Sequence, residues 1–356
     1  MPTDLLTELV RRYSPSTQEN EAVDYLVAWM RDGGFHAYCD AAGNACGIRG
    51  PLDAPNTLIL LGHIDTVPGL IPVRIENGCL YGRGSVDAKG SLSAFAEAAA
   101  RACLPDGWRV VVIGAVEEEI ATSRGAVFVR DHFSPTACII GEPSGTERIT
   151  LGYKGRLLVD YRLTRPVAHT AQPTPSVGEL GFTFWQKITG WVNNRNAGIA
   201  GFFDRVTPHL RSINTETDHF ADTLNLTISF RLPPGLSPEE TFAALKTFAE
   251  PDAELHPYGM EHAYRGDRAN GLVRGMLAAI RAEGSQPGFV LKTGTSDMNV
   301  VARRWNCPII AYGPGDSSLD HTPDEHIPLV EYRHSIEVLR RFLENLSVLS
   351  DYANPL

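Results

Sequence analysis

The sequence predicts an α/β protein with a mostly parallel central sheet flanked by helices, and a small α+β domain inserted into it. In the N-terminal half, short apolar runs alternate with helical stretches, which is typical of buried strands covered by helices on both faces. Beyond about residue 155 the runs alternate apolar and polar residues, which is typical of antiparallel strands with one solvated face. The first pattern returns after about residue 263.

The first region begins with a helix pair over residues 4–34. We expect Ser16 and Glu19 to form a capping box at the second helix, which Gly33 and Gly34 end. The elements that follow are buried strands at 57–61, 109–114 and 137–140 and an Ala-rich helix at 91–102.

The inserted region carries the two period-two strands and two further helices, and an α/β segment closes the chain. The predicted elements are strands at 156–163 and 224–232, helices at 176–194 and 238–249, then a helix at 270–283, a strand at 307–312 and a helix at 328–349. We therefore expect one domain over residues 1–154 and 264–356, interrupted by a second domain over residues 155–263.

Composition excludes several classes of protein. The 356 residues are 43% hydrophobic and 21% charged, which excludes a disordered chain and a coiled coil. The formal net charge of −10 argues against nucleic-acid binding, because phosphate backbones repel an acidic protein. The N-terminus lacks the pattern of a secretory signal, no apolar run is long enough for a membrane span, and the six cysteines are scattered. We expect a cytoplasmic protein that does not contact membranes.

Histidines and acids follow several predicted strands, where the ligands of α/β sheets gather. Each site alone fits a plainer interpretation: a surface His–Asp pair, a helix cap or a solvated acidic loop. The sites are His63-x-Asp65, Asp87 between Gly82 and Gly90, Glu117-Glu118-Glu119, Glu142, and His321 within Leu319–His326.

Together these sites form a mixed nitrogen and oxygen donor set without cysteine, which suits zinc, cobalt or manganese. A bridging carboxylate can hold two divalent ions about 3.5–4 Å apart. A glutamate beside the ligands could then take a proton from water and deliver it to a leaving amine.

The same motifs, in the same order, resemble the metallopeptidase M20 family, which includes acetylornithine deacetylase, succinyl-diaminopimelate desuccinylase and glutamate carboxypeptidase. The resemblance covers nearly the whole chain. It implies a homodimeric amide hydrolase with two divalent metal ions per subunit, zinc or cobalt. It also implies these roles: His63, Asp87 and Glu142 hold one metal, Asp87 bridges to a second held by Glu119 and His321, Glu118 is the general base, and Asp65 orients His63.

Three adjacent acids leave two possible pairs of base and ligand. The pattern of the family, an acid followed by two glutamates, aligns best with Glu117-Glu118-Glu119 and makes Glu118 the base. The sequence departs from the family at the next position, where Ile120 replaces a frequent glycine.

The inserted domain resembles the dimerisation (lid) domain of the family. Pro166–Pro173 is similar to the segment whose histidine, here His169, reaches the active site of the partner subunit and stabilises an oxyanion. Arg231 resembles the arginine that grips a substrate carboxylate, with Asn225 as a possible helper. Gly294-Thr295-Ser296 resembles a substrate-binding loop, and the competing interpretation is a structural turn.

Within the family, Gly152-Tyr-Lys-Gly-Arg156 and Gly294–Asn299 are similar to a subgroup that releases lysine or ornithine from the C-terminal glutamate of a small acidic amino-group carrier protein, LysW, in lysine and arginine biosynthesis. An acidic carrier would need local basic groups on this acidic chain. The candidate pairs are Arg303 with Arg304, Lys154 with Arg156, and Lys187 with Arg195. The alternatives are a deacylase of N-acetylornithine, N-acetyllysine or N-acetylcitrulline, an aminopeptidase, and an inactive dimeric binding scaffold.

Overall fold

The structure, a computed structural model, describes residues 4–169, 171 and 173–350. The chain divides into two compact units. The first comprises Met1–Gly152, Gly266–Leu291 and Ser296–Leu356, and the second comprises Tyr153–Arg265 and Lys292–Thr295. The short segment Lys292–Thr295 thus joins the second unit, although the segments on either side of it belong to the first.

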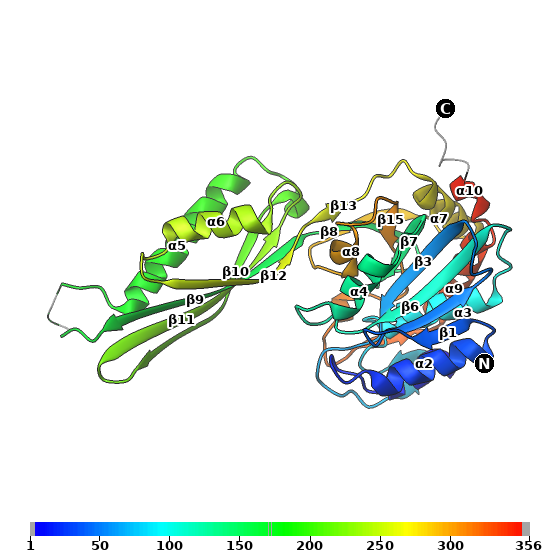
Figure 1. The fold of residues 1–356 in the computed structure, drawn as a ribbon, viewed down its shortest axis with the longest axis horizontal. Coiled ribbons are helices and arrows are strands. Elements are labelled where there is room, and N and C mark those ends of the chain that lie inside the picture. The colour runs from blue at the N-terminus through cyan, green and yellow to red at the C-terminus, as the bar shows by residue number, and fades with distance from the viewer. Residues whose placement is uncertain (1–3, 170, 172, 351–356) are drawn as a thin grey trace. The chain divides into compact units, whose positions relative to one another are not determined.

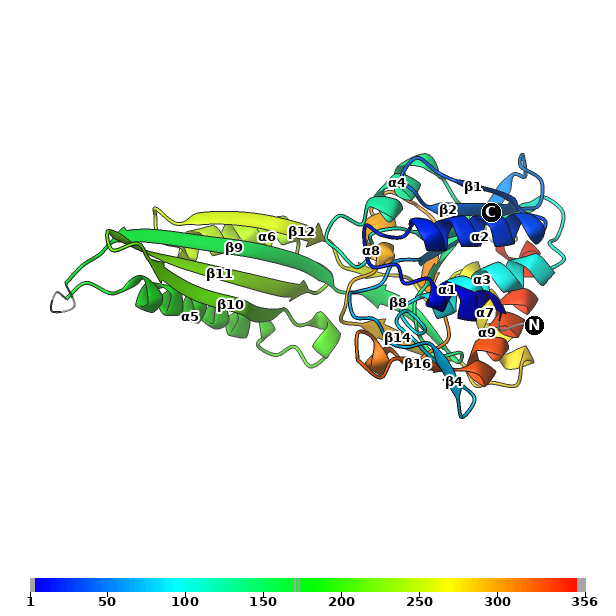
Figure 2. The same ribbon diagram turned by 90° about the horizontal axis from the view of Figure 1, so that it is seen from below.

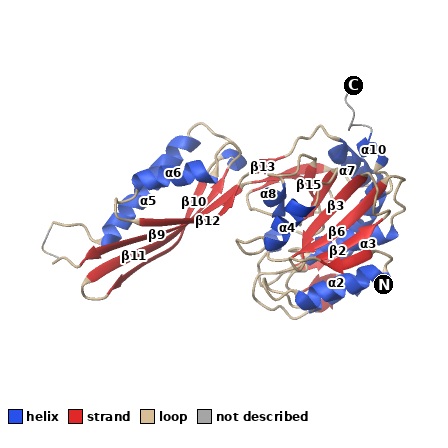
Figure 3. Ribbon diagram, in the orientation of Figure 1, coloured by secondary structure: helices blue, strands red, loops and turns tan. Residues whose placement is uncertain are grey.

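The first unit is built on a large sheet whose central strands are parallel (Figures 1 and 3). The central order is β6-β3-β7-β15, and antiparallel pairs add β2 and β1 at one side and β8 at the other. Its strands are β1 (His36–Cys39), β2 (Ala45–Arg49), β3 (Asn56–His63), β6 (Trp108–Ala115), β7 (Ala137–Gly141), β8 (Arg148–Tyr153), β14 (Gly288–Lys292) and β15 (Ile309–Ala311). A small antiparallel sheet has the order β16-β5-β4 and consists of β4 (Arg74–Glu76), β5 (Cys79–Tyr81) and β16 (His326–Pro328).

Helices cover the central strands on both faces. Alternate residues such as Leu58 and Leu60 join one core with helices α1, α2, α3, α7 and α9. The intervening Ile59 and Leu61 are also fully buried, and α4 and α8 contact β6 and β15. The helices of this unit are α1 (Asp4–Arg11), α2 (Asn20–Asp32), α3 (Lys89–Arg101), α4 (Arg124–His132), α7 (Gly271–Ala282), α8 (Asp297–Val301), α9 (Leu329–Leu343) and α10 (Ser347–Ser350), with a 3-10 turn η2 (Ser317–Leu319). A sheet buried on both faces explains why its strands read as continuous apolar runs.

Two local expectations are wrong. The single helix predicted over 328–349 is divided into α9 and α10. The predicted capping box does not form, because the Ser16 hydroxyl donates to a carboxylate oxygen of Asp65 at 2.7 Å, and α2 begins only at Asn20. The Ser16 hydroxyl thus donates to a buried carboxylate, whereas as a cap its oxygen would have accepted a backbone N–H of the helix.

The second unit is a four-stranded antiparallel sheet with two helices on one face, as Figures 1 and 2 show. The strand order is β10-β11-β9-β12. Its elements are β9 (Gly155–Pro166), α5 (Val177–Asn196), η1 (Phe202–Asp204), β10 (Thr207–Thr217), β11 (Ala221–Leu232), α6 (Pro238–Phe248), β12 (Glu254–Glu261) and, at the boundary of the unit, β13 (Tyr264–Arg265). Ser176 and Ser237 form capping boxes with Glu179 and Glu240 at the starts of the helices.

The two faces of this sheet differ in chemistry. The alternation along β9 turns Leu157, Val159, Tyr161 and Leu163 toward α5 and α6 in an apolar core. Among the intervening positions, Asp160, Arg162 and Thr164 carry polar side chains on the open face, whereas Leu158 is apolar and buried. The period-two pattern in the sequence therefore corresponds to a sheet with one solvated face. Among the described residues of the chain, no helix is long and apolar enough to cross a membrane.

Candidate metal centre

The ends of three parallel strands bring the candidate residues together. In register, Gly62 of β3 lies opposite Gly114 of β6 and Gly141 of β7. His63 is therefore the last residue of β3, Glu142 follows β7 directly, and the loop with Glu118 and Glu119 follows β6 at the same edge of the sheet. Strand order thus explains why residues far apart in sequence meet.

Asp87 occupies the centre of the cluster. One of its carboxylate oxygens lies 3.1 Å from Nε2 of His63, and the other lies 3.0 Å from Nε2 of His321. Nε2 of His321 is also 3.1 Å from a carboxylate oxygen of Glu119. One ligand atom each of His63, Asp87 and Glu119 lies within 4.8 Å of the others. The two oxygens of Asp87 thus face two different histidines, as a bridging ligand requires.

Asp65 fixes the geometry around this cluster. Its fully buried carboxylate lies 3.4 Å from Nδ1 of His63, which accounts for the orientation of the imidazole. The same carboxylate accepts the backbone N–H groups of Glu118 and Glu119, each at 3.1 Å, and the hydroxyl of Ser16. Asp65 therefore positions a histidine and the acidic loop at once. Sequence reasoning missed Ser16 as part of the site, because the spacing of Ser16 and Glu19 suggested a cap.

Glu117 turns away from the cluster. Its carboxylate accepts from Nε of Arg124 and from the hydroxyl of Thr122, each at 2.7 Å. Its backbone is in the left-handed region with φ 61°, and its N–H donates to buried Glu19. The backbone reversal at Glu117 separates it from its two neighbours, which favours Glu118 and Glu119 as the pair of base and ligand.

The electrostatics of the cluster separate the acids into two kinds. Burial raises the pKa of Glu118 well above its ordinary value, and the charges of Glu142, Asp297 and Glu119 raise it further against the opposing effect of His63. Burial also works to raise the pKa of Asp87, but hydrogen bonds from His321 and His63 hold it below its usual range. A glutamate with a raised pKa next to an aspartate with a lowered pKa is an arrangement suited to acid–base chemistry.

The histidines hold their protons tightly in the presence of these acids. Hydrogen bonds to Asp87 and Glu119 raise the pKa of His321 to about 10. Burial alone would lower the pKa of His63, but Asp65 and Asp87 raise it well above its ordinary value. The donor set of imidazole nitrogens and carboxylate oxygens, without a thiolate, fits divalent zinc, cobalt or manganese.

The remaining candidates lie in the second unit or at its limits. His169 is exposed, and its Nδ1 accepts the backbone N–H of Ala171 at 3.1 Å. This bond leaves the proton of the neutral ring on Nε2, which is then a hydrogen-bond donor. Thr170 and Gln172 of the same segment lie outside the described residues.

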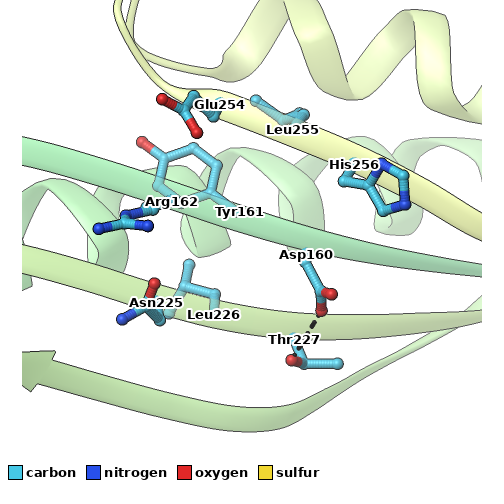
Figure 4. A pocket seen from close by; sticks show the side chains of 9 residues that line it. All are labelled: Asp160, Tyr161, Arg162, Asn225, Leu226, Thr227, Glu254, Leu255 and His256. Atoms are coloured by element: carbon cyan, nitrogen blue, oxygen red, sulfur yellow. Dashed lines mark hydrogen bonds between the residues drawn. The ribbon is translucent and has the colours of Figure 1, made fainter.

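Arg231 and Asn225 do not meet. Nη1 of Arg231 donates to the hydroxyl of Thr295 at 3.2 Å. Asn225 lies six residues along the same strand, which corresponds to ~20 Å. Figure 4 shows Asn225 on the open face of the sheet, near Arg162, Asp160 and Thr227, in a shallow groove that does not include Arg231.

The loop that precedes α8 divides between two roles. Ser296 caps α8, since its hydroxyl accepts the N–H of Met298 at 3.2 Å. The hydroxyl of Thr295 accepts a hydrogen bond from Arg231, and a side chain added at Gly294 would point into open space. The structural interpretation therefore accounts for Ser296, whereas Thr295 belongs with Arg231.

Comparison with known proteins agrees with this geometry. The model of peptidase family M20/M25/M40 matches residues 59–345, which include all the proposed metal ligands. The chain belongs to this family. It is therefore a hydrolase of amide bonds.

Similar proteins extend over almost the full chain. The [LysW]-lysine hydrolase of Deinococcus radiodurans is 44% identical over 351 residues, 96% of each chain. A putative [LysW]-lysine/[LysW]-ornithine hydrolase of Thermococcus kodakarensis is 38% identical over 96% of this chain and 91% of its own. Among solved structures, an M20 family metallo-carboxypeptidase from Sulfolobus solfataricus has a TM-score of 0.77 at 19% identity, and the match covers 96% of this chain and 98% of that one. This last likeness supports the shared fold.

Proposed function

We propose that this enzyme hydrolyses the amide bond between lysine or ornithine and the γ-carboxyl of the C-terminal glutamate of a LysW-type carrier protein. The observation that carries this proposal is the 44% identity to a [LysW]-lysine hydrolase over 96% of both chains. The cluster around Asp87 supports the hydrolytic chemistry. The product enters the biosynthesis of lysine or of arginine.

The residues of the cluster fit two divalent cations, zinc or cobalt. We assign His63, Asp87 and Glu142 to one ion, and Asp87, Glu119 and His321 to the other. The support is the placement of the two Asp87 oxygens toward different histidines, together with a donor set free of thiolates. Bound divalent metals supply Lewis acidity, which makes water a better nucleophile and polarises a carbonyl.

Glu118 is the proposed general base. Its raised pKa lets it accept a proton from the attacking water and later donate that proton to the amine that leaves. Asp65 keeps the Glu118 backbone in place through the N–H bond described above. The leaving group is the α-amine of lysine or ornithine, so one proton transfer in each direction completes the hydrolysis.

We further propose a homodimer built through the second unit. Strand β10 pairs only with β11 among the described strands, and most of its residues are exposed. The exposed apolar side chains Ile213 of β10 and Phe182 of α5 are 48% and 63% accessible. An open strand edge beside apolar side chains is a natural pairing surface for a second copy. In such a dimer the Nε2–H of His169 would serve the partner's site as an oxyanion donor.

Substrate contacts are assigned by resemblance and by position. We propose that Arg231 and Thr295 bind a substrate carboxylate and that Gly294 and Ser296 shape the loop. Asn225 is a separate contact on the same sheet face.

Lys154 does not serve as a surface contact for an acidic carrier, since its side chain is buried and its ammonium donates to the carbonyl of Arg205 and the hydroxyl of Thr207. Because all six cysteines are free, we expect the enzyme to act in the reducing cytoplasm.

A substrate panel tests this proposal. Purified enzyme loaded with zinc or cobalt is given a LysW-type carrier with lysine on its C-terminal glutamate, the same carrier with ornithine, N-acetyllysine, N-acetylornithine, N-acetylcitrulline and unmodified dipeptides. We expect kcat/KM for a carrier substrate to exceed that of every acetylated amino acid. Equal or inverted values would assign the enzyme to the small-molecule deacylases, and no hydrolysis of any compound would indicate a binding scaffold.

A further inference from the structure

A buried ion pair lies directly behind the bridging aspartate. The carboxylate of Glu325 is fully buried, and Nη1 of Arg83 donates to it at 2.8 Å. Its other oxygen accepts two backbone N–H groups, that of Val86 at 2.9 Å and that of Asp87 at 3.1 Å. Nε of Arg83 donates to the carbonyl of Gly69 at 3.0 Å. Burying two charges is costly, and four hydrogen bonds offset that cost for this pair.

The pair joins two segments that each carry a proposed metal ligand. Glu325 lies 238 residues after Asp87 in the chain, yet it accepts the N–H of that residue, and it follows His321 by only four positions. The segment after it continues as β16, which pairs antiparallel with β5, so that His326 lies opposite Tyr81. The N–H of Gly82 also donates to the Glu325 carbonyl at 3.3 Å. The loop of Asp87 and the loop of His321 are thus held together at Glu325.

The orientation of Asp87 has to be set accurately, because its two oxygens serve two different partners. A rotation of its backbone would move one oxygen away from His63 and the other away from His321. The side chain of Asp87 cannot anchor itself, since both of its oxygens are engaged at the cluster. The anchor therefore has to act on its backbone, and Glu325 is the group that does so through the N–H bonds of Val86 and Asp87.

We propose that Glu325, supported by Arg83, is a positioning residue that orients the carboxylate of Asp87 toward the two metal ions that it would hold. It touches no substrate and acts only through the backbone of Asp87 and the segment of His321. This inference rests on the two-metal centre assigned under Proposed function. Groups that hold metal ligands in this way typically change metal affinity 10–100-fold when they are replaced.

The test compares Glu325→Gln with a matched control, Glu97→Gln. Glu97 is also a buried acid of the first unit, and it pairs with Arg101 and accepts from the hydroxyl of Tyr332, neither of which is a proposed ligand. Cobalt(II) is titrated into metal-free protein, and visible absorption reports the coordination while calorimetry reports the number of ions and the affinity of each. We expect wild type and Glu97→Gln to bind two ions alike. Glu325→Gln should bind the second ion about 10–100-fold more weakly, with an altered cobalt spectrum.

Further variants separate positioning from folding. At saturating metal, Glu325→Gln should lower kcat with little change in KM, because the substrate contacts are intact. Glu325→Asp keeps the charge, and Arg83→Lys keeps Glu325 and its backbone bonds. Each of these variants should therefore bind the second metal ion more tightly than Glu325→Gln does. If Glu325→Gln does not fold, Arg83→Lys alone has to weaken the second ion relative to Glu97→Gln.

The outcomes distinguish this inference from the proposed function. Wild-type protein that binds fewer than two ions would contradict the two-metal centre itself. Suppose instead that wild-type protein binds two ions and that Glu325→Gln and Arg83→Lys match its affinities and cobalt spectrum. This result would overturn the positioning role and leave the proposed function intact. An equal loss of affinity in Glu97→Gln would also overturn it.

Discussion

The two units of the chain present their chemical groups in opposite ways. In the first unit, acids and histidines from four segments meet in one cluster in which neighbouring ligand atoms lie about 3 Å apart. In the second unit, the candidate residues are spread along an open sheet face and an exposed loop, as Arg231, Asn225 and His169 show. The first unit therefore carries a reaction centre by itself, whereas the second offers contacts that a substrate or a second subunit has to complete.

Charge divides between the units as well. The second unit has twelve Lys and Arg residues against twelve Asp and Glu residues, so the whole net charge of −10 belongs to the first unit. An acidic carrier is repelled by the first unit over distances of about a Debye length, but not by the second.

The largest expected effect lies in the first unit. Glu118→Gln should lower kcat by about 10²–10⁴-fold, because the amide cannot accept a proton from water. Metal content, measured by atomic emission, should not change. Glu117→Gln is the matched control, and it should stay within about fivefold of wild type, since Glu117 bonds to Arg124 and not to the cluster, and an ion pair with an exposed arginine contributes about 0–1 kcal/mol. Comparable losses in both variants would mean that the base has been assigned to the wrong glutamate.

A smaller effect is expected on the sheet face of the second unit. Arg231→Lys should raise KM for carrier-linked lysine about 10-fold or more, because a lysine cannot form the paired hydrogen bonds that an arginine gives a carboxylate. Arg162→Lys, on the same face beside Asn225, provides the control and should leave KM for carrier-linked lysine unchanged (Figure 4). If the two variants behave alike in steady-state kinetics, Arg231 has no special part in carboxylate binding.

Sequence alone predicted the first unit better than the second, and the reason is geometric. His63, Glu119 and Glu142 could be grouped because neighbouring parallel strands end at one edge of a sheet. Arg231 and Asn225 lie on one predicted strand, but six residues along a strand separate them by ~20 Å. Their spacing in the sequence therefore gave no reason to group them in one site. Ser16 and Glu325 were not predicted as parts of the site, since each acts through a contact across a long stretch of chain, Ser16 to Asp65 and Glu325 to Asp87.

Dimer formation should depend on the edge of the second unit. Ile213→Lys places a charge on the exposed edge strand β10 and should raise the dimer dissociation constant about 10-fold, since charged side chains are a common means of blocking edge pairing. Analytical ultracentrifugation over a range of concentrations measures the shift. Ile75→Lys alters a similarly exposed isoleucine of the first unit and should have no effect. A wild-type monomer with full activity would remove both the dimer and the role of His169 in the partner's site.

The smallest effect concerns stability in the second unit. Burial lowers the pKa of Lys154 to about 8, below the value of about 10.4 in an unfolded chain. Between pH 8 and pH 10 the unfolded chain therefore binds more protons than the folded one, and this group makes the unfolding free energy rise with pH. The free energy of wild type relative to Lys154→Met should increase by about 1 kcal/mol or more across that window. Urea unfolding of wild type and Lys154→Met at several pH values measures it. A flat difference for Lys154→Met would place the ammonium in contact with water, and Lys154 would then return to the set of surface cations available to an acidic carrier.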